Sequence, residues 1–96
     1  MSGLLSPQEA QSLLDQGGVV VDVRTAEEYD HGHVPGSIHL PVHLVPHLAS
    51  ERLPKDRPLL LCCASGARSH MAVQYLRHLG FDAHNLGPWT CHPSFI

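Results

Sequence analysis

The fold of this chain is decided by the stretch Pro58-Leu59-Leu60-Leu61-Cys62-Cys63-Ala64-Ser65-Gly66-Ala67-Arg68-Ser69. Residues 58–62 form an apolar run typical of a buried strand, and residues 69–79 continue in a helical pattern. A short glycine-containing loop between a strand and a helix directs backbone N–H groups and a helix N-terminus at one point. The partial positive charge gathered there favours a thiolate over a thiol, so we expect Cys63 to be reactive.

Strands and helices alternate on both sides of this stretch. Two capping boxes predict the starts of helices, and the β-branched run at residues 19–23 predicts a central buried strand. The alternation predicts an α/β fold, residues 1–96 as a single domain, with a small parallel sheet of about five strands and helices on both faces. The capping boxes are Ser6-Pro7-Gln8-Glu9 and Thr25-Ala26-Glu27-Glu28; the other expected elements are strands at residues 4–5, 37–40, 58–62 and 82–86 and a helix at residues 44–53.

Two segments are expected to meet at one end of the sheet. Sites in parallel sheets lie beyond the carboxyl ends of the strands, and both Cys63 and the segment Asp22-Val23-Arg24 fall at such ends. We expect Arg68 to brace the loop by pairing with Asp22 or Glu28; the alternative is that its guanidinium binds an anionic substrate. Ser69 is predicted to be the N-cap of the helix that follows the loop.

Composition excludes several classes of protein. The 96 residues carry a net charge of -3 with histidine neutral and no run of lysine or arginine, which argues against nucleic-acid binding. No apolar stretch approaches the length of a membrane span, and the first 20 residues lack the basic region of a signal peptide. Three cysteines, two of them adjacent, do not make a disulfide framework, so we expect a reduced, cytoplasmic protein. Its oligomeric state is left open.

Two motifs in the right order carry a family resemblance. The first half holds Val21-Asp22-Val23-Arg24, Glu28-Tyr29 and Gly32-His33-Val34-Pro35-Gly36-Ser37-Ile38, and the second half holds Cys63-x-x-Gly66-x-Arg68-Ser69. These are similar to the "DVR…E(Y/F)…GHIPGA" stretch and the active-site loop of single-domain rhodaneses, a family of sulfurtransferases. The resemblance runs from Ser6 to Trp89. It departs at Gly87-Pro88, where the family often has Gly-Gly, and after Trp89, where a closing helix common in the family is shortened or absent.

The rhodanese resemblance implies a reaction and a set of residues. Cys63 would attack the outer sulfur of a donor such as thiosulfate or a persulfide, become a persulfide itself, and pass the sulfur to a thiol, a protein or cyanide. No cofactor is implied. The small side chains of the loop let backbone N–H groups approach a soft sulfur anion closely. The implied substrate-binding loop is Ala64, Ser65, Gly66, Ala67, Arg68 and Ser69, and the supporting residues are Asp22, Arg24 and Glu28.

Two other functions stay open. Five residues lie between Cys62 and Arg68, as in cysteine phosphatases, so an arsenate reductase or small phosphatase using Cys62 or Cys63 is the first alternative. The position of Gly66, three residues after Cys63, favours the sulfurtransferase count, and Cys62 is then expected to point into the core. The second alternative is a rhodanese-like module that binds a partner or carries a persulfide without turnover.

We assign no functional site to the histidines or to the C-terminal tail. Nine histidines are present, but no Cys-x-x-Cys or His-Glu-x-x-His motif, so we predict no metal site. His33 is expected to donate a hydrogen bond to a backbone carbonyl. Cys91 could serve as a second thiol near the site, although we expect the tail that carries it to be mobile and exposed.

Overall fold

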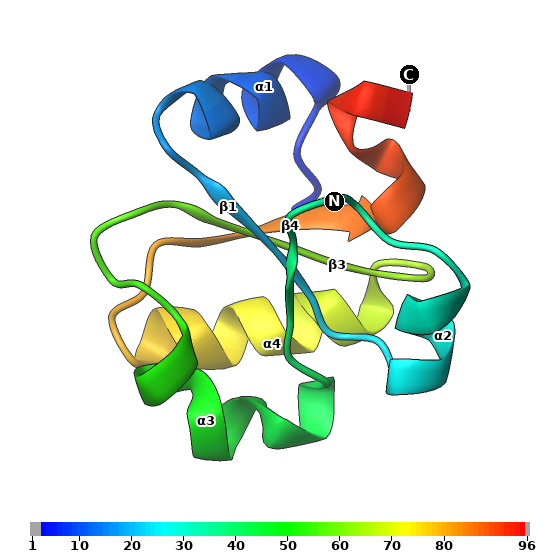
Figure 1. Ribbon diagram of the computed structural model, residues 1–96. Coiled ribbons are helices and arrows are strands. Elements are labelled where there is room, and N and C mark those ends of the chain that lie inside the picture. Colours follow the sequence, from blue (N-terminus) through cyan, green and yellow to red (C-terminus); the bar gives the residue numbers. More distant parts are fainter. Residues whose placement is uncertain (1–2, 96) are drawn as a thin grey trace.

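A parallel four-stranded sheet with strand order β2-β1-β3-β4 forms the centre of the computed structural model, which describes residues 3–95. Figure 1 shows α1 on one side of the sheet and α3 and α4 on the other. The α/β class, the parallel sheet and the helices on both faces are thereby confirmed. The strands are β1 (Val19–Asp22), β2 (Ile38–His39), β3 (Leu59–Cys63) and β4 (Ala83–Pro88); the helices are α1 (Pro7–Asp15), α2 (Ala26–His31), α3 (Val45–Arg52) and α4 (Ala67–His78); the 3₁₀ turns are η1 (Val42–Leu44), η2 (Trp89–Cys91) and η3 (Pro93–Phe95).

Both predicted capping boxes are present. The Ser6 hydroxyl accepts from the Glu9 N–H at 3.1 Å, and the Glu9 carboxylate accepts from the Ser6 N–H at 2.8 Å. Thr25 and Glu28 repeat this pair of bonds at the start of α2. Each box satisfies backbone donors that a helix start otherwise leaves without partners, which is why these short sequences fix the two starts.

The expected number of strands is wrong by one. Residues 4–5 do not form a strand: Leu4 makes a single isolated parallel bridge to Asn85, and the Leu5 N–H donates to the Asn85 carbonyl at 2.9 Å. The pairing cannot continue because Ser6 already caps α1 and Pro7, its first residue, has no N–H to donate. The N-terminal segment therefore touches β4 without extending the sheet.

Strand β3 is buried along its whole length and divides the core into two layers. Leu59, Leu61 and Cys63 belong to the larger cluster, together with residues of α3 and α4. Leu60 and Cys62 belong to the smaller cluster, together with Ala10 of α1. Because side chains alternate across a strand, the two adjacent cysteines face different layers.

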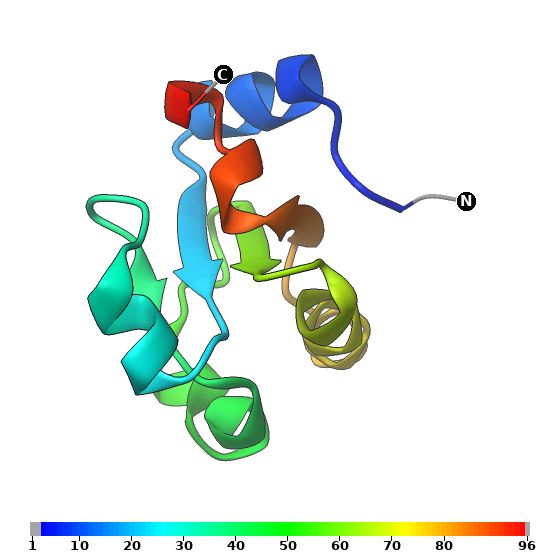
Figure 2. The same cartoon turned by 90° about the vertical axis from the view of Figure 1, so that its right-hand side faces the viewer.

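The C-terminal residues lie against the rest of the domain, and Cys91 is exposed, as expected of the tail. Turn η3 lies against α1, and Figure 2 shows both C-terminal turns on that side of the sheet. The Trp89 and Phe95 rings meet edge to face with centroids 5.5 Å apart, which joins the two turns, and Trp89 packs against the smaller cluster that includes Ala10 of α1. These two short turns stand where a closing helix was expected to be shortened or absent. None of the helices in residues 3–95 is long and apolar enough to cross a membrane.

Candidate active site

The loop after β3 wraps around the sulfur of Cys63. Cys63 is the last residue of the strand and is fully buried, and its Sγ accepts a hydrogen bond from the Gly66 N–H at 3.0 Å. Gly66 has a φ of +100°, and a Cβ at this position would lie 3.2 Å from the Gly87 Cα. A residue with a side chain would be strained and crowded here, so glycine is what lets the loop turn back toward the sulfur.

The helix after the loop begins earlier than predicted. Gly66, not Ser69, is the N-cap of α4, and it makes no side-chain capping bond. The prediction that Ser69 caps the helix is therefore wrong. The left-handed turn at Gly66 sends the chain into the helix at Ala67, which places Ser69 inside the first turn. There Ser69 is fully buried and its Oγ lies 3.5 Å from the Cys63 Sγ.

The surroundings of Cys63 favour the thiolate. Burial alone raises the pKa of the Cys63 thiol, but hydrogen bonding from the Ser69 hydroxyl and from backbone N–H groups at Ser69, Gly66 and Ser65 outweighs it. The pKa of Cys63 therefore lies below the ordinary value for a thiol. A thiolate held by backbone donors is a soft nucleophile ready to attack an electrophilic sulfur.

Cys62 has the opposite environment. Its side chain is fully buried in the smaller cluster, in agreement with the expectation that it points into the core. Burial raises the pKa of Cys62 strongly, and the Asp22 carboxylate raises it further. A thiol of this kind stays protonated at neutral pH and is a poor nucleophile.

Arg68 joins the loop to α2. Of the two carboxylates expected as its partner, Glu28 is in contact: the two guanidinium nitrogens lie 2.7 and 2.9 Å from the two Glu28 oxygens. The pair is about one-third exposed. Hydrogen bonding to Arg68, added to that from Thr25, lowers the pKa of Glu28 to about 2. Hydrogen bonding to Glu28 is the main cause that raises the pKa of Arg68, and the nearby Cys63 thiolate adds to it.

Asp22 and Arg24 lie together, apart from the loop. The Arg24 guanidinium binds the Asp22 carboxylate at 2.7 to 3.0 Å, donates to the Gly32 carbonyl at 2.6 Å and lies 4.8 Å from the centre of the Trp89 ring. Both residues are buried, and their charges act on Cys62. The expectation that this segment and Cys63 share one crevice is not met: Asp22 and Arg24 act on Cys62, and Glu28, which lies outside the segment, is what reaches the loop through Arg68.

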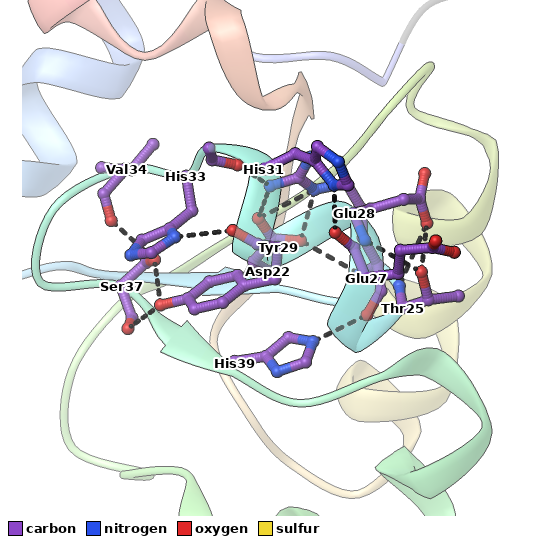
Figure 3. Close-up of polar contacts among 12 residues, drawn as sticks. Asp22, Thr25, Glu27, Glu28, Tyr29, His31, His33, Val34, Ser37 and His39 are labelled. Atoms are coloured by element: carbon purple, nitrogen blue, oxygen red, sulfur yellow. Dashed lines mark hydrogen bonds and ion pairs between the residues drawn. The ribbon is translucent and has the colours of Figure 1, made fainter.

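The histidines near α2 form a stack instead of a cluster of ligands. The Tyr29 ring lies between the His33 and His39 rings, with centroid separations of 3.7 and 4.3 Å (Figure 3). As expected, His33 donates to a backbone carbonyl, that of Tyr29, at 2.8 Å; His39 donates to the Arg24 carbonyl in the same way. Within residues 3–95, no three His, Cys, Asp or Glu side chains come together as a metal site would require.

One polar residue at the loop was missed by the sequence analysis. Asn85 of β4 is 4% exposed and binds both Ser69 and Gly66 through its side-chain amide. The signal in the sequence was an asparagine inside a predicted strand, where this residue type is disfavoured unless its amide has a specific partner.

Fold and loop together define the class of this protein: an α/β domain whose parallel sheet presents one cysteine to a ring of backbone donors at the start of a helix. The family follows from comparison with known sequences. The chain belongs to the rhodanese-like domain family, whose sequence model matches residues 6–87, and the resemblance drawn from the motifs is confirmed.

Relatives in this family carry sulfurtransferase names. A sulfurtransferase of Allochromatium vinosum is 44% identical over 73 residues, which cover 75% of this chain and 67% of the relative. The thiosulfate sulfurtransferase GlpE of Pseudomonas savastanoi is 38% identical over 78 residues, covering 81% and 73%. Among solved structures, a rhodanese-related protein from Thermoplasma volcanium superposes with a TM-score of 0.80 over 96% of this chain and 88% of that protein. At 24% identity, this last match supports the fold alone.

Proposed function

We propose that this chain transfers sulfane sulfur from a donor such as thiosulfate to a thiol acceptor through a persulfide on Cys63. One observation carries the proposal: the Cys63 sulfur is held by the Gly66 N–H at 3.0 Å, in a loop that favours the thiolate. The names of the relatives support the same chemistry. The three cysteines are free thiols, which suits a reducing compartment such as the cytoplasm.

The reaction divides into two displacements at sulfur. The Cys63 thiolate attacks the outer sulfur of thiosulfate, a new S–S bond forms, and the S–S bond of thiosulfate breaks as sulfite leaves with the electron pair. An acceptor thiolate then attacks the outer sulfur of the Cys63 persulfide and regenerates the Cys63 thiolate. Cyanide can replace the thiol and leaves as thiocyanate. The backbone donors of the loop stabilise the negative charge on sulfur through both steps.

The environment of Cys62 argues against the phosphatase alternative that counts from this residue. A buried thiol with a raised pKa cannot supply a nucleophile at neutral pH, whatever the number of residues before Arg68. Counted from Cys63, the loop is one residue shorter, and we expect it to be too small for a tetrahedral oxyanion. We therefore predict no useful hydrolysis of aryl phosphates.

The direct test is intact mass after treatment with thiosulfate. The proposal expects a gain of one sulfur atom in the parent, no gain in Cys63→Ser, and loss of the added sulfur on addition of cyanide or a small thiol. A parent that gains no sulfur, although it is folded and reduced, contradicts the proposal. A sulfur that is taken up but not passed on identifies the non-catalytic carrier instead.

A further inference from the structure

Asn85 is the residue at which the loop, the helix and the last strand meet. Its Oδ1 accepts hydrogen bonds from the Ser69 hydroxyl at 2.7 Å and from the Gly87 N–H at 2.9 Å. Its Nδ2 donates to the Gly66 carbonyl at 3.1 Å. Asn85 is almost fully buried, so water cannot easily replace these partners.

The strand register explains how Asn85 reaches the loop. Leu61 is opposite Asn85, but the next residue of β3, Cys62, is opposite Gly87, so β4 carries one extra residue at this point. Such a bulge bends a strand and redirects its side chains. Gly87, which follows the bulge with a φ of +91°, gives its N–H to the Asn85 amide.

The hydroxyl of Ser69 has one proton and two neighbours that can accept it. The short bond to Asn85 Oδ1 takes this proton, which leaves the Ser69 oxygen free to accept the proton of the neutral Cys63 thiol at 3.5 Å. When Cys63 is a thiolate, the hydroxyl can turn its proton to the sulfur, because Asn85 Oδ1 keeps its bond from the Gly87 N–H. Asn85 is thus satisfied in both states of the sulfur.

The amide nitrogen of Asn85 acts on the other donor to the sulfur. Gly66 gives its N–H to Cys63 and receives the Asn85 Nδ2–H on its carbonyl, so this residue is fixed from both sides. A glycine has the most backbone freedom of any residue and loses it only where contacts hold it. Asn85 supplies one of those contacts.

We propose that Asn85 is a positioning residue that acts on Cys63 in two ways: its Nδ2 fixes the Gly66 backbone, whose N–H stabilises negative charge on Cys63, and its Oδ1 competes with the thiolate for the Ser69 proton. It does not touch the reacting sulfur itself. The importance of Asn85 for sulfur transfer rests on the proposed function, whereas its effect on the Cys63 thiol does not.

The test measures the rate of alkylation of Cys63 by iodoacetamide against pH, read by mass mapping so that the Cys63 label is separated from that on the exposed Cys91, with no sulfur donor or acceptor present. Asn85→Ala releases the Gly66 backbone, which raises the midpoint, and frees the Ser69 proton for the sulfur, which lowers it. In the Ser69→Ala background only the first effect remains, so there Asn85→Ala is expected to raise the midpoint by about half a pH unit or more, the size of one weakened hydrogen bond. Asn85→Asp keeps the shape but removes the donor to Gly66 and adds a negative charge, so its midpoint should rise above that of the parent. Val20→Ala is the matched control, because Val20 is buried in the smaller cluster away from the loop.

Two further results keep the proposal falsifiable. Ser69→Ala should raise the midpoint on its own, and the double variant should be shifted by more than the sum of the two single shifts, because each single substitution removes the same competition for the Ser69 proton. The proposal is overturned if folded Asn85→Asp titrates like the parent and Val20→Ala, if the double variant titrates like Ser69→Ala, or if the two single shifts simply add. Failure of thiosulfate to load sulfur onto the parent, with the midpoints shifted as expected, would refute the proposed function and leave the role of Asn85 intact.

Discussion

Cys62 and Cys63 are neighbours in the chain, but they lie on opposite faces of β3 and have opposite environments. Cys62 faces the smaller apolar cluster, where burial and the Asp22 carboxylate raise the pKa of its thiol. Cys63 faces the loop, where the Ser69 hydroxyl and backbone N–H groups lower the pKa in spite of burial. Both side chains are fully buried, so exposure does not distinguish them.

The difference between the two cysteines lies in hydrogen-bond donors. Removal from water disfavours either thiolate, and only donors aimed at the sulfur can compensate for the lost solvation. The loop supplies these donors to one face of the strand because it turns back at Gly66. The reactivity of a strand-end cysteine is therefore set by the next few residues of the chain, and each prediction below tests one part of this contrast.

The largest expected effect separates the two cysteines by substitution. Cys63→Ser should reduce sulfur transfer from thiosulfate to the background rate, because a hydroxyl cannot form a persulfide. Cys62→Ala should keep most of the activity and cost about 1 kcal/mol of stability through lost packing. Steady-state assays with thiosulfate and cyanide, with circular dichroism as the check on folding, measure both. Equal loss of activity in the two folded variants would contradict the contrast.

The second effect separates the two thiols by titration. In the parent, the alkylation of Cys63 should have its midpoint below the free-thiol value of about 8.5. In Cys63→Ser, the folded protein should be labelled at the exposed Cys91 alone, and Cys62 should react only after denaturation. Mass mapping of the labelled peptides identifies each site. A Cys63 midpoint at or above the free value would mean that the donors do not stabilise the thiolate.

The third effect concerns the brace between the loop and α2. If Arg68 acts through Glu28, Arg68→Ala and Glu28→Gln should slow transfer from every donor alike. Each variant should lose less than about 1 kcal/mol of stability, because the pair is partly exposed and screened by solvent. Thermal melts and kinetics with thiosulfate and a neutral donor measure this. An Arg68→Ala variant that melts like the parent and has a raised Michaelis constant for thiosulfate alone would assign Arg68 to donor binding.

The smallest effect is the acid dependence of the same brace. The pKa of Glu28 is lowered from 4.5 to about 2, so its stabilising contribution is present above the ordinary carboxyl pKa and is lost as pH falls through about 2. The stability difference between the parent and Glu28→Gln should therefore shrink between about pH 5 and about pH 2. Urea denaturation at several pH values measures it. A difference that stays constant over this range would show that the carboxylate charge is not what holds Arg68.

Local sequence patterns predicted most of the fold but only part of the site. The capping boxes, the apolar run of β3 and the glycine of the loop act over a few residues, so their consequences can be deduced without a structure. Ser69 and Asn85 are 16 residues apart, and Arg68 and Glu28 are 40 apart. The first contact depends on the bulge in β4, and no pattern in the sequence located that bulge. Ser69 was accordingly assigned to the wrong role and Asn85 was missed.

The short outer strands of the sheet have a consequence for the behaviour of the protein in concentrated solution. Strand β2, at one edge of the sheet, is two residues long and is soon followed by Pro41. Strand β4, at the other edge, pairs with Leu4 through one isolated bridge, is interrupted by the bulge and ends at Pro88. Long, unpaired edge strands pair with strands of other molecules, whereas short, bulged or proline-ended edge strands do not. The bulge that brings Asn85 to the loop around Cys63 thus also protects the β4 edge against edge-to-edge aggregation.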